Sequence, residues 1–330
     1  MPGGAQLVDR ASARRVLTAG DTFLTFGGGE THLLFQQGYP LREFCAFEVL
    51  RDDAVFERMA SALLRPILDA AAAGGHGVIT DCFLWRASPD YMTKLGYAAE
   101  DVRRFNHEGV ALLRRLLAEA ASRPGGHPGP LVLAADPGPR GDGYALEPGR
   151  TLDAAAARAY HTPQLAALAE TDAAVVVALT MTSVAEAVGL GLAARDHGLP
   201  LIVSPTVETD GTLPDGTPLG DFITSVDDAL GGDPIFYMVN CAHPTHLEAT
   251  LDAARLAGAP WLSRFRGIRA NASAKSHQEL DDSTELDRGD VNDLAARVAN
   301  LRARYDLWAV GGCCGTDAEH LKAIATACRR

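Results

Sequence analysis

The sequence has no long hydrophobic run. No stretch approaches the roughly 20 consecutive apolar residues that a membrane-spanning helix needs. The residues Met1 to Thr18 include arginines, but they contain no apolar core of signal-peptide length. We therefore expect a cytoplasmic protein that makes no contact with a membrane.

Positive charge is also scarce. The chain has 30 Lys and Arg residues against 42 Asp and Glu residues, a formal net charge of −12. Nucleic acids and anionic membranes therefore have no overall electrostatic reason to bind it. We expect small-molecule partners and no nucleic-acid partner, and the sequence leaves a homo-oligomer possible.

Aromatic residues make up only 6% of the 330 residues, yet hydrophobic residues as a whole reach 47%. A chain of this length and composition can bury a large core, which excludes a disordered protein. No internal repeat or interior linker divides it, so we expect one domain over residues 1–330. Because we expect a reducing compartment, its six cysteines are interpreted as free, catalytic or metal-bound, and not as structural disulfides.

Short apolar runs alternate with alanine- and leucine-rich stretches of helical periodicity. The expected strands are Thr22–Phe26, Gly77–Phe83, Leu131–Ala135, Ala174–Leu179, Leu199–Ser204, Pro234–Cys241, Phe265–Asn271 and Leu307–Val310. Expected helices include Ala99–Ala121, Val184–Asp196, His246–Ala257, Val291–Tyr305 and Asp317–Arg330. Such alternation predicts parallel strands joined by right-handed crossovers. Eight units favour a (β/α)8 TIM barrel of the α/β class, with a doubly wound open sheet as the alternative.

Two adjacent cysteines, Cys313 and Cys314, lie in a glycine-rich turn directly after the last expected strand. Cys241 ends another expected strand, so three thiols lie at two strand ends, where the active site of a barrel is found. Zinc takes tetrahedral nitrogen and sulfur ligands, and a catalytic site leaves one position open. Three thiolates make a poor activator of water, but they suit holding a fourth thiolate that stays nucleophilic, as alkyl transfer to a thiol requires.

Other interpretations of these cysteines remain open. Cys313 and Cys314 could be small buried residues or a vicinal redox disulfide, and Cys241 could be a core residue. A local zinc site of Cys241, His243 and His246 is also possible, although Pro244 makes that spacing awkward.

The segments Val239-Asn240-Cys241 and Gly311-Gly312-Cys313-Cys314-Gly315-Thr316 resemble the zinc signature of the homocysteine S-methyltransferase family. The resemblance covers nearly the whole chain. It implies a (β/α)8 barrel in which Cys241, Cys313 and Cys314 bind zinc and a thiol acceptor takes the open position. Family donors include S-methylmethionine, S-adenosylmethionine, betaine and methyl-tetrahydrofolate.

Weaker matches to the family provide candidates for the substrate side. After the first strand the chain has Gly27-Gly28, Thr31 and Leu33, then Gly38, and Asn271 ends the seventh strand. The substrate-side candidates are Gly27, Gly28, Thr31, Asp81 and Asn271. The two glycines could instead serve a tight turn, and Asn271 could cap a loop.

The chain departs from the family at positions that are usually acidic. Phe26 and His32 stand where the first motif commonly has aspartate and glutamate, and Thr180 replaces a usual glutamate that would bind the substrate ammonium. Glu30 and Asp81 could supply replacement carboxylates, or they could be solvated loop charges. The identity of the acceptor is therefore left open.

We thus expect a zinc-dependent S-methyltransferase that acts on homocysteine or a related small thiol, giving methionine or another thioether, with no protein nucleophile. A sulfonium or quaternary ammonium donor is expected, and S-methylmethionine or S-adenosylmethionine is favoured. Phe26, Phe83 and Trp85 could form a cation–π wall for this donor, or they could simply pack against neighbours. The alternatives are a non-catalytic zinc- or thiol-sensing barrel, and a demethylase that uses homocysteine as the methyl sink.

Overall fold

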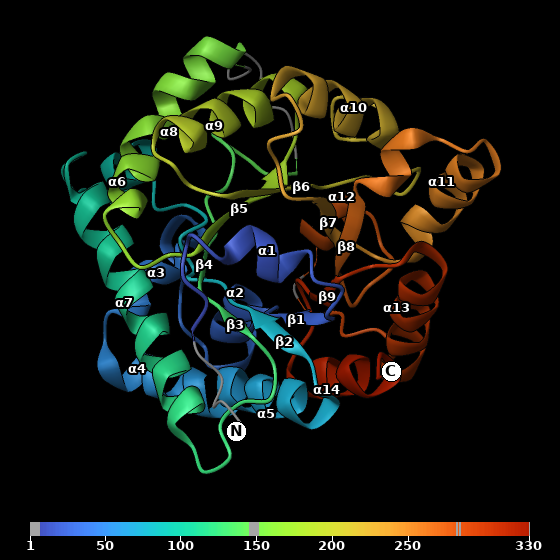
Figure 1. Cartoon of the computed structure of the whole chain (residues 1–330). Helices are drawn as coiled ribbons and strands as arrows, with labels where there is room; N and C mark the ends of the chain where they lie inside the picture. Colours follow the sequence, from blue (N-terminus) through green and yellow to red (C-terminus); the bar gives the residue numbers. More distant parts are fainter. Residues whose placement is uncertain (1–6, 145–151, 282, 284, 330) are drawn as a thin grey trace.

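The computed structural model describes residues 7–144, 152–281, 283 and 285–329. One parallel sheet forms a barrel that is surrounded by helices (Figure 1). Its strands are β1 (Phe23–Thr25), β2 (Gly77–Ile79), β3 (Leu131–Val132), β4 (Ala134–Ala135), β5 (Val175–Met181), β6 (Leu201–Pro205), β7 (Tyr237–Ala242), β8 (Phe265–Ala270) and β9 (Ala309–Gly312).

The strand order is β3-β2-β1-β9-β8-β7-β6-β5-β4. The two ends of this order, β3 and β4, are halves of the segment Leu131–Ala135, which was expected as one strand. β3 pairs with β2 and β4 pairs with β5, so the segment closes the barrel from both sides. The nine strands therefore correspond to the eight of a (β/α)8 barrel, and the expected fold is confirmed.

Helices follow the strands and form the outer layer of the barrel. The longer ones are α4 (Asp53–Met59), α5 (Arg65–Gly74), α7 (Asp101–Ser122), α8 (Ala154–Ala169), α9 (Val184–Asp196), α10 (Leu219–Ala229), α11 (Thr245–Leu256), α13 (Val291–Tyr305) and α14 (Ala318–Ala327). Shorter helices include α1 (Ala13–Leu17), α2 (Gly29–Thr31), α3 (Ala46–Leu50), α6 (Pro89–Lys94) and α12 (His277–Asp281). No helix in the described ranges is long and apolar enough to span a membrane.

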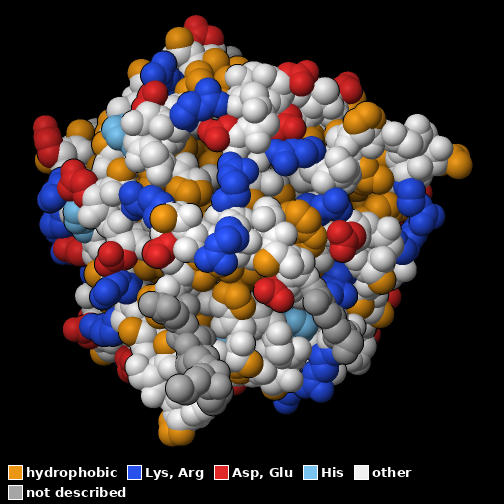
Figure 2. Space-filling view, in the orientation of Figure 1, with side chains coloured by type: hydrophobic (Ala, Val, Ile, Leu, Met, Phe, Trp, Pro, Cys, Tyr) orange, Lys and Arg blue, Asp and Glu red, His pale blue; other side chains and the backbone are white. Residues whose placement is uncertain are grey.

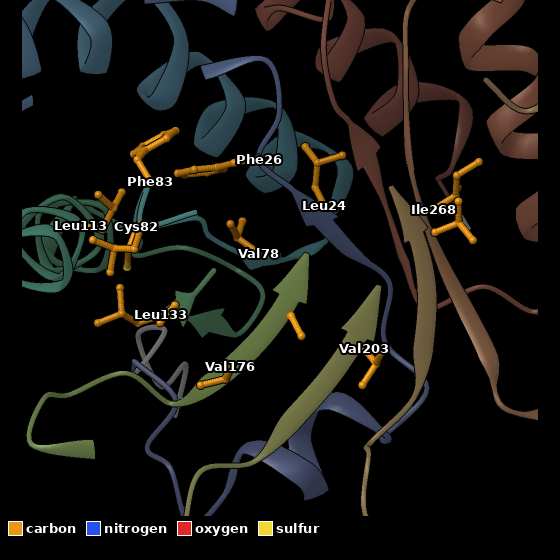
Figure 3. Packing of buried hydrophobic residues seen from close by; sticks show 14 of the residues in the cluster. Leu24, Phe26, Val78, Cys82, Phe83, Leu113, Leu133, Val176, Val203 and Ile268 are labelled. Carbon is orange, nitrogen blue, oxygen red and sulfur yellow. The ribbon is translucent and has the colours of Figure 1, made fainter. Parts of the chain in front are cut away.

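Alternation along the strands separates two apolar layers. Leu24 and Val78 face outward and belong to one cluster with helix residues such as Leu113, which lies beside Cys82 in Figure 3. Phe23 and Val175 belong to the second cluster, which fills the barrel interior. This packing fixes the strands, and hence the side chains that follow their carboxyl ends.

The amino-terminal end of the barrel is covered by α1, which crosses the centre of the view in Figure 1. Ala13 and Leu17 of this helix join the interior cluster. Just before it, Arg10 donates to the carbonyls of Ala169 (3.0 Å) and Thr171 (2.8 Å). On the face seen in Figure 2, acidic and basic side chains are interspersed, with scattered hydrophobic ones between them. The carboxyl ends of the strands lie at the opposite end of the barrel.

Candidate active site

Three strand ends carry residues with an unusual backbone conformation. Phe83 follows β2, Thr180 lies near the end of β5 and Cys241 near the end of β7, and their φ angles are 59°, 59° and 56°. Left-handed φ is uncommon for residues other than glycine and clusters at functional sites. At Cys241 this conformation coincides with an irregularity in the register between β7 and β8, between Asn240 and Ala242.

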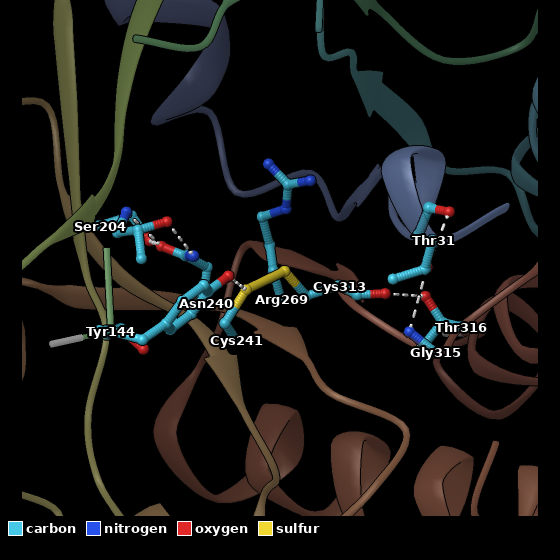
Figure 4. Close-up of a disulfide and its surroundings, with 12 residues drawn as sticks. Thr31, Tyr144, Ser204, Asn240, Cys241, Arg269, Cys313, Gly315 and Thr316 are labelled. Carbon is cyan, nitrogen blue, oxygen red and sulfur yellow. Dashed lines mark hydrogen bonds between the residues drawn. A yellow bond between two sulfur atoms is a disulfide. The ribbon is translucent and has the colours of Figure 1, made fainter. Parts of the chain in front are cut away.

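Asn240, which precedes Cys241, ties three strand ends together (Figure 4). Its Oδ1 accepts from the backbone N–H of Thr180 (2.8 Å) and from the Ser204 hydroxyl (2.7 Å). Its Nδ2 donates to Oγ1 of Thr180 (2.8 Å). Because all these groups are buried, their hydrogen bonds hold β5, β6 and β7 in register beside the cysteine.

The carbonyl of Cys241 is held as well. His277 donates from Nε2 to this oxygen (2.8 Å), and its Nδ1 lies 3.1 Å from Oε1 of Glu208. The ring also packs against Tyr144, with centroids 4.7 Å apart. α12 therefore helps to fix the backbone that presents the cysteine.

The Cys313-Cys314 turn packs closely against the segment that follows β1. A side chain at Gly27 would overlap the backbone of Gly312, and one at Gly28 would overlap the carbonyl of Thr316. Thr31 receives a hydrogen bond from the N–H of Gly315 (3.3 Å) and donates to the carbonyl of Gly28 (3.1 Å). The two glycines thus permit close approach of two backbones.

The sulfur atoms of Cys241, Cys313 and Cys314 lie within 4.8 Å of one another. The structure joins Cys241 to Cys313 as a disulfide, with Cα atoms 5.4 Å apart, while Cys314 is free (Figure 4). The expectation that no disulfide forms is therefore wrong for Cys241 and Cys313, whereas Cys45, Cys82, Cys314 and Cys328 are free as expected. The physical reason is that sulfurs close enough to share one metal ion are also close enough to bond to each other.

The donor set suits a soft metal ion. Once the bond between Cys241 and Cys313 is reduced, three thiol sulfurs from two strand ends would leave one tetrahedral position free, the arrangement of a catalytic zinc site. Burial, followed by the charge of Glu30, raises the pKa of the Cys314 thiol to about 11. At neutral pH this sulfur is thus a thiol unless a cation stabilises the thiolate.

Tyr144 completes the surroundings of the sulfurs. Its hydroxyl donates to Sγ of Cys241 (3.2 Å), and its ring lies beside that of Trp85, with centroids 6.2 Å apart. Burial, with a further contribution from Cys314, raises the pKa of Tyr144 well above its ordinary value. The phenol therefore stays protonated and remains a hydrogen-bond donor.

The alternative site of Cys241, His243 and His246 is not assembled. Nδ1 of His243 lies 2.8 Å from the Thr245 hydroxyl, and Nε2 of His246 lies 3.0 Å from the carbonyl of Ala274. In the part of the chain that the structure describes, the three cysteines form the one cluster of His, Cys, Asp and Glu side chains that could hold a metal ion.

Two cavities meet at the sulfurs. The smaller, of about 40 Å³, is lined by Gly28, Asp81, Thr180, Asn240 and all three cysteines, among others. The larger, of about 360 Å³, is lined by Asn271, Ser273, His277 and Glu285, among others, and extends toward the exposed side chain of Phe35. The residues that line both are Thr31, Phe44, Tyr144 and Cys314.

The substrate-side candidates are divided between these cavities. Asp81 lies in the smaller one and forms a bidentate ion pair with Arg269, whose Nη1 donates to Oδ1 at 2.8 Å. Asn271 lines the larger one, and its buried Oδ1 has no hydrogen-bond partner among the described residues. Gly28 and Thr31 line the smaller cavity, whereas Gly27 supports the turn beside it.

The aromatic residues differ from the expected set. Phe26 and Phe83 are buried in the outer core, and only Trp85 of the three lines the smaller cavity. Phe44 and Tyr144 line both cavities instead. The sequence did not predict Asp136, Tyr144 or Arg269 as site residues. Asp136 and Tyr144 lie in a Gly- and Pro-rich loop after β4 that has no recognisable spacing pattern, and Arg269 lies within a strand whose sequence pattern is ordinary.

Comparisons with known proteins agree with this fold. The fold is similar to crystal structures of the homocysteine methyltransferase MmuM from Escherichia coli. Its metallated form gives a TM-score of 0.67 at 20% identity, over 93% of this chain and 96% of that chain. Its oxidized form gives a TM-score of 0.71 at 20% identity, over 95% of this chain and 99% of that chain. At this identity the likeness concerns the fold.

No curated protein matches the chain in sequence. The family model described as homocysteine S-methyltransferase, however, matches residues 45–328, which include all three clustered cysteines and most of the barrel. The chain is therefore an S-methyltransferase that belongs to the homocysteine S-methyltransferase family.

Proposed function

We propose that the protein is a zinc-dependent enzyme that transfers a methyl group from a sulfonium or quaternary ammonium donor to homocysteine or a related small thiol. The observation that carries the proposal is the convergence of Cys241, Cys313 and Cys314 at the meeting point of two cavities. Zinc at these sulfurs would supply the acceptor as its thiolate at neutral pH.

The two cavities support separate places for the two substrates. The smaller one lies beside all three sulfurs, which suits the acceptor. The larger one shares Cys314 with it and has room for S-methylmethionine or S-adenosylmethionine. The rings of Phe35, Phe44 and Tyr144 line this larger cavity, and aromatic faces attract cations.

The chemistry then needs only alignment. The acceptor sulfur attacks the donor methyl carbon, a new carbon–sulfur bond forms, and the bond from the methyl to the donor sulfur or nitrogen breaks. The leaving group departs with the electron pair, as a neutral thioether or amine, and the acceptor thiol has already lost its proton to solvent. Holding the two reacting atoms in line supplies much of the rate enhancement.

The test is methyl transfer by zinc-loaded, reduced protein over crossed panels of thiols and donors, with thioether products followed by mass spectrometry. Zinc per chain is measured in parallel for Cys314→Ser and for a matched control, Cys328→Ser, which is buried at the end of α14. We expect one zinc per chain in the wild type and the control, and loss of zinc and of product in Cys314→Ser.

Methionine formation would establish homocysteine as an acceptor, and a different thioether would establish another thiol. Turnover only with an unusual methylated donor would favour the demethylase alternative. No product from any pair in zinc-replete protein would refute the proposed enzyme and favour a sensing barrel.

A further inference from the structure

The smaller cavity has an unbalanced set of charges. Glu30, Asp81 and Asp136 contribute three carboxylates, whereas Arg269 is the one Lys or Arg among its described lining residues. The metal thiolates beside them would add further negative charge. With all three carboxylates ionised, a cationic ligand would balance the charge of this cavity.

The single guanidinium is already engaged. Arg269 reaches across the barrel from β8, and its two terminal nitrogens donate to both oxygens of Asp81. Its Nη2 also donates to the carbonyl of Phe26 (3.0 Å), and only 6% of the side chain is exposed. The bidentate fork that would bind the carboxylate of a ligand is thus occupied by the protein's own carboxylate.

Glu30 and Asp136 have no such partner. Oδ1 of Asp136 accepts the N–H groups of Cys82 (2.8 Å) and Leu84 (3.2 Å), and no basic side chain in the described ranges bonds to it. No hydrogen bond joins the Glu30 carboxylate to another described side chain. These two groups are the carboxylates of the cavity that remain available to a ligand.

The pKa values of both carboxyls agree with a missing cation. Burial, followed by repulsion from Asp81, raises the pKa of Glu30 to about 7, although the charges of Arg269 and Arg86 partly offset this rise. Burial, followed by the charges of Asp81 and Glu30, raises the pKa of Asp136 well above its ordinary value. A bound ammonium would reverse both shifts, because an opposite charge favours the ionised form.

We infer that the preferred acceptor is a small thiol that carries an ammonium group and no carboxylate, with its nitrogen bound by Glu30 and Asp136 and its sulfur at the three cysteines. The inference rests on the proposed function, because it assigns the acceptor to the cavity beside the sulfurs. A volume of about 40 Å³ suits a chain of few atoms. An amino-acid thiol would bring its carboxylate among three others, and Arg269, the one cation among the described lining residues, is already paired with Asp81.

Three thiols with the same three-carbon spacing test this charge preference. 3-Aminopropane-1-thiol carries only the amine, 4-mercaptobutanoate carries only the carboxylate, and homocysteine carries both. We expect kcat/KM for the aminothiol to exceed that for homocysteine by about tenfold and that for the mercaptobutanoate by about 100-fold, since like charges in a buried site cost several kcal/mol. Equal or better use of homocysteine would overturn the inference.

Variants locate the effect. Glu30→Gln should raise KM for the aminothiol about tenfold and leave KM for the neutral 3-mercaptopropan-1-ol unchanged. Asp136→Asn should have the same two effects. The control is Glu119→Gln on the outer helix α7, which should change KM for neither thiol. If Glu30→Gln and Asp136→Asn weaken the neutral thiol as much as the aminothiol, the ammonium site is refuted.

A binding measurement separates this inference from the proposed function. Calorimetric titration of zinc-loaded protein with 3-(methylthio)propylamine, methionine and 4-(methylthio)butanoate needs no turnover. Tightest binding of the amine supports the charge preference even if no thiol is methylated, a result that would refute only the proposed reaction. Tighter binding of methionine or of the butanoate would overturn the inference.

Discussion

The ion pair between Asp81 and Arg269 offers a sharp test of the energetics of the barrel mouth. Asp81 follows β2, Arg269 lies on β8, and their side chains are 8% and 6% exposed. Asp81→Asn keeps the shape of the side chain but removes its charge. Arg269 would then keep the carbonyl of Phe26 and the one amide oxygen of the new side chain as acceptors, but it would have lost the carboxylate that bonds to it.

The expected loss of unfolding free energy depends on whether the partner that remains can lose its charge. Burial lowers the pKa of Arg269, but Asp81 outweighs this effect and keeps that pKa above its ordinary value. A guanidinium cannot lose its proton in the protein, so Asp81→Asn leaves an uncompensated buried charge. Breaking such a pair costs about 3 to 5 kcal/mol. We expect the lower end, about 3 kcal/mol, because Glu30 and Asp136 lie in the same cavity.

The assay is urea unfolding in reductant and chelator, which removes any contribution from metal binding. Far-ultraviolet circular dichroism and tryptophan fluorescence should coincide if the transition is two-state. The control is Asp53→Asn, because Asp53 pairs with Arg115 at 3.2 Å while both side chains are largely exposed, at 84% and 62%. That exposed pair should contribute at most about 1 kcal/mol.

Arg269→Met completes the comparison. It removes the guanidinium, and the carboxyl that remains can take up a proton, so we expect a smaller loss of stability than in Asp81→Asn. The reasoning fails if Asp81→Asn loses no more stability than Asp53→Asn, or if Arg269→Met is the more damaging of the two buried changes.

Two further predictions concern the cysteine turn. Gly28 and Gly38 have similar φ angles of 68° and 71°, but only at Gly28 would a Cβ meet another atom, the carbonyl of Thr316. Gly38→Ala should therefore cost about 1 kcal/mol of unfolding free energy, and Gly28→Ala about 1 to 3 kcal/mol more, whereas equal losses would refute the close-approach role. Asp317 caps α14: burial opposes its ionisation, but hydrogen bonds from His320 outweigh this and hold the carboxyl pKa below its usual value. Asp317→Ala should cost about 1 kcal/mol of unfolding free energy at pH 7. Because the pKa of Asp317 is lowered in the folded protein, its ionised form stabilises the fold above the unfolded pKa of about 4, and this contribution is lost as the pH falls toward the folded pKa. Thermal melts should therefore show the stability difference between wild type and variant narrowing below about pH 4, and a difference that does not change with pH would contradict the ionic part of this cap.

Periodicity alone predicted most of the barrel. α9 and α13 have the expected bounds, because their apolar spacing and their capping residues, Ser183 and Asp290, are local features. The segment Leu131–Ala135 was expected as one strand, but it is divided at Leu133, since its two halves pair with different neighbours. That division depends on how the barrel closes, which no local pattern records.

The site was predictable where residues sit in a motif and unpredictable where they meet through the fold. Cys241 and Cys313 are far apart in sequence, but each ends a strand, and parallel strands bring such ends together. Asp136 and Arg269 carry no comparable signal. They join the site only because β4 and β8 direct them into the same cavity, which the sequence does not mark.

The pairing of β1 with β9 has a consequence for the order in which the molecule can form. Phe23 pairs with Ala309, so nearly the whole described chain must be synthesised before β1 acquires its second neighbour. Such distant contacts slow folding and leave strand edges exposed on the ribosome. Two of the three clustered thiols, Cys313 and Cys314, also emerge only then. Closure of the barrel and completion of the thiol cluster are thus one late event, and a nascent chain that stops short of residue 309 lacks both.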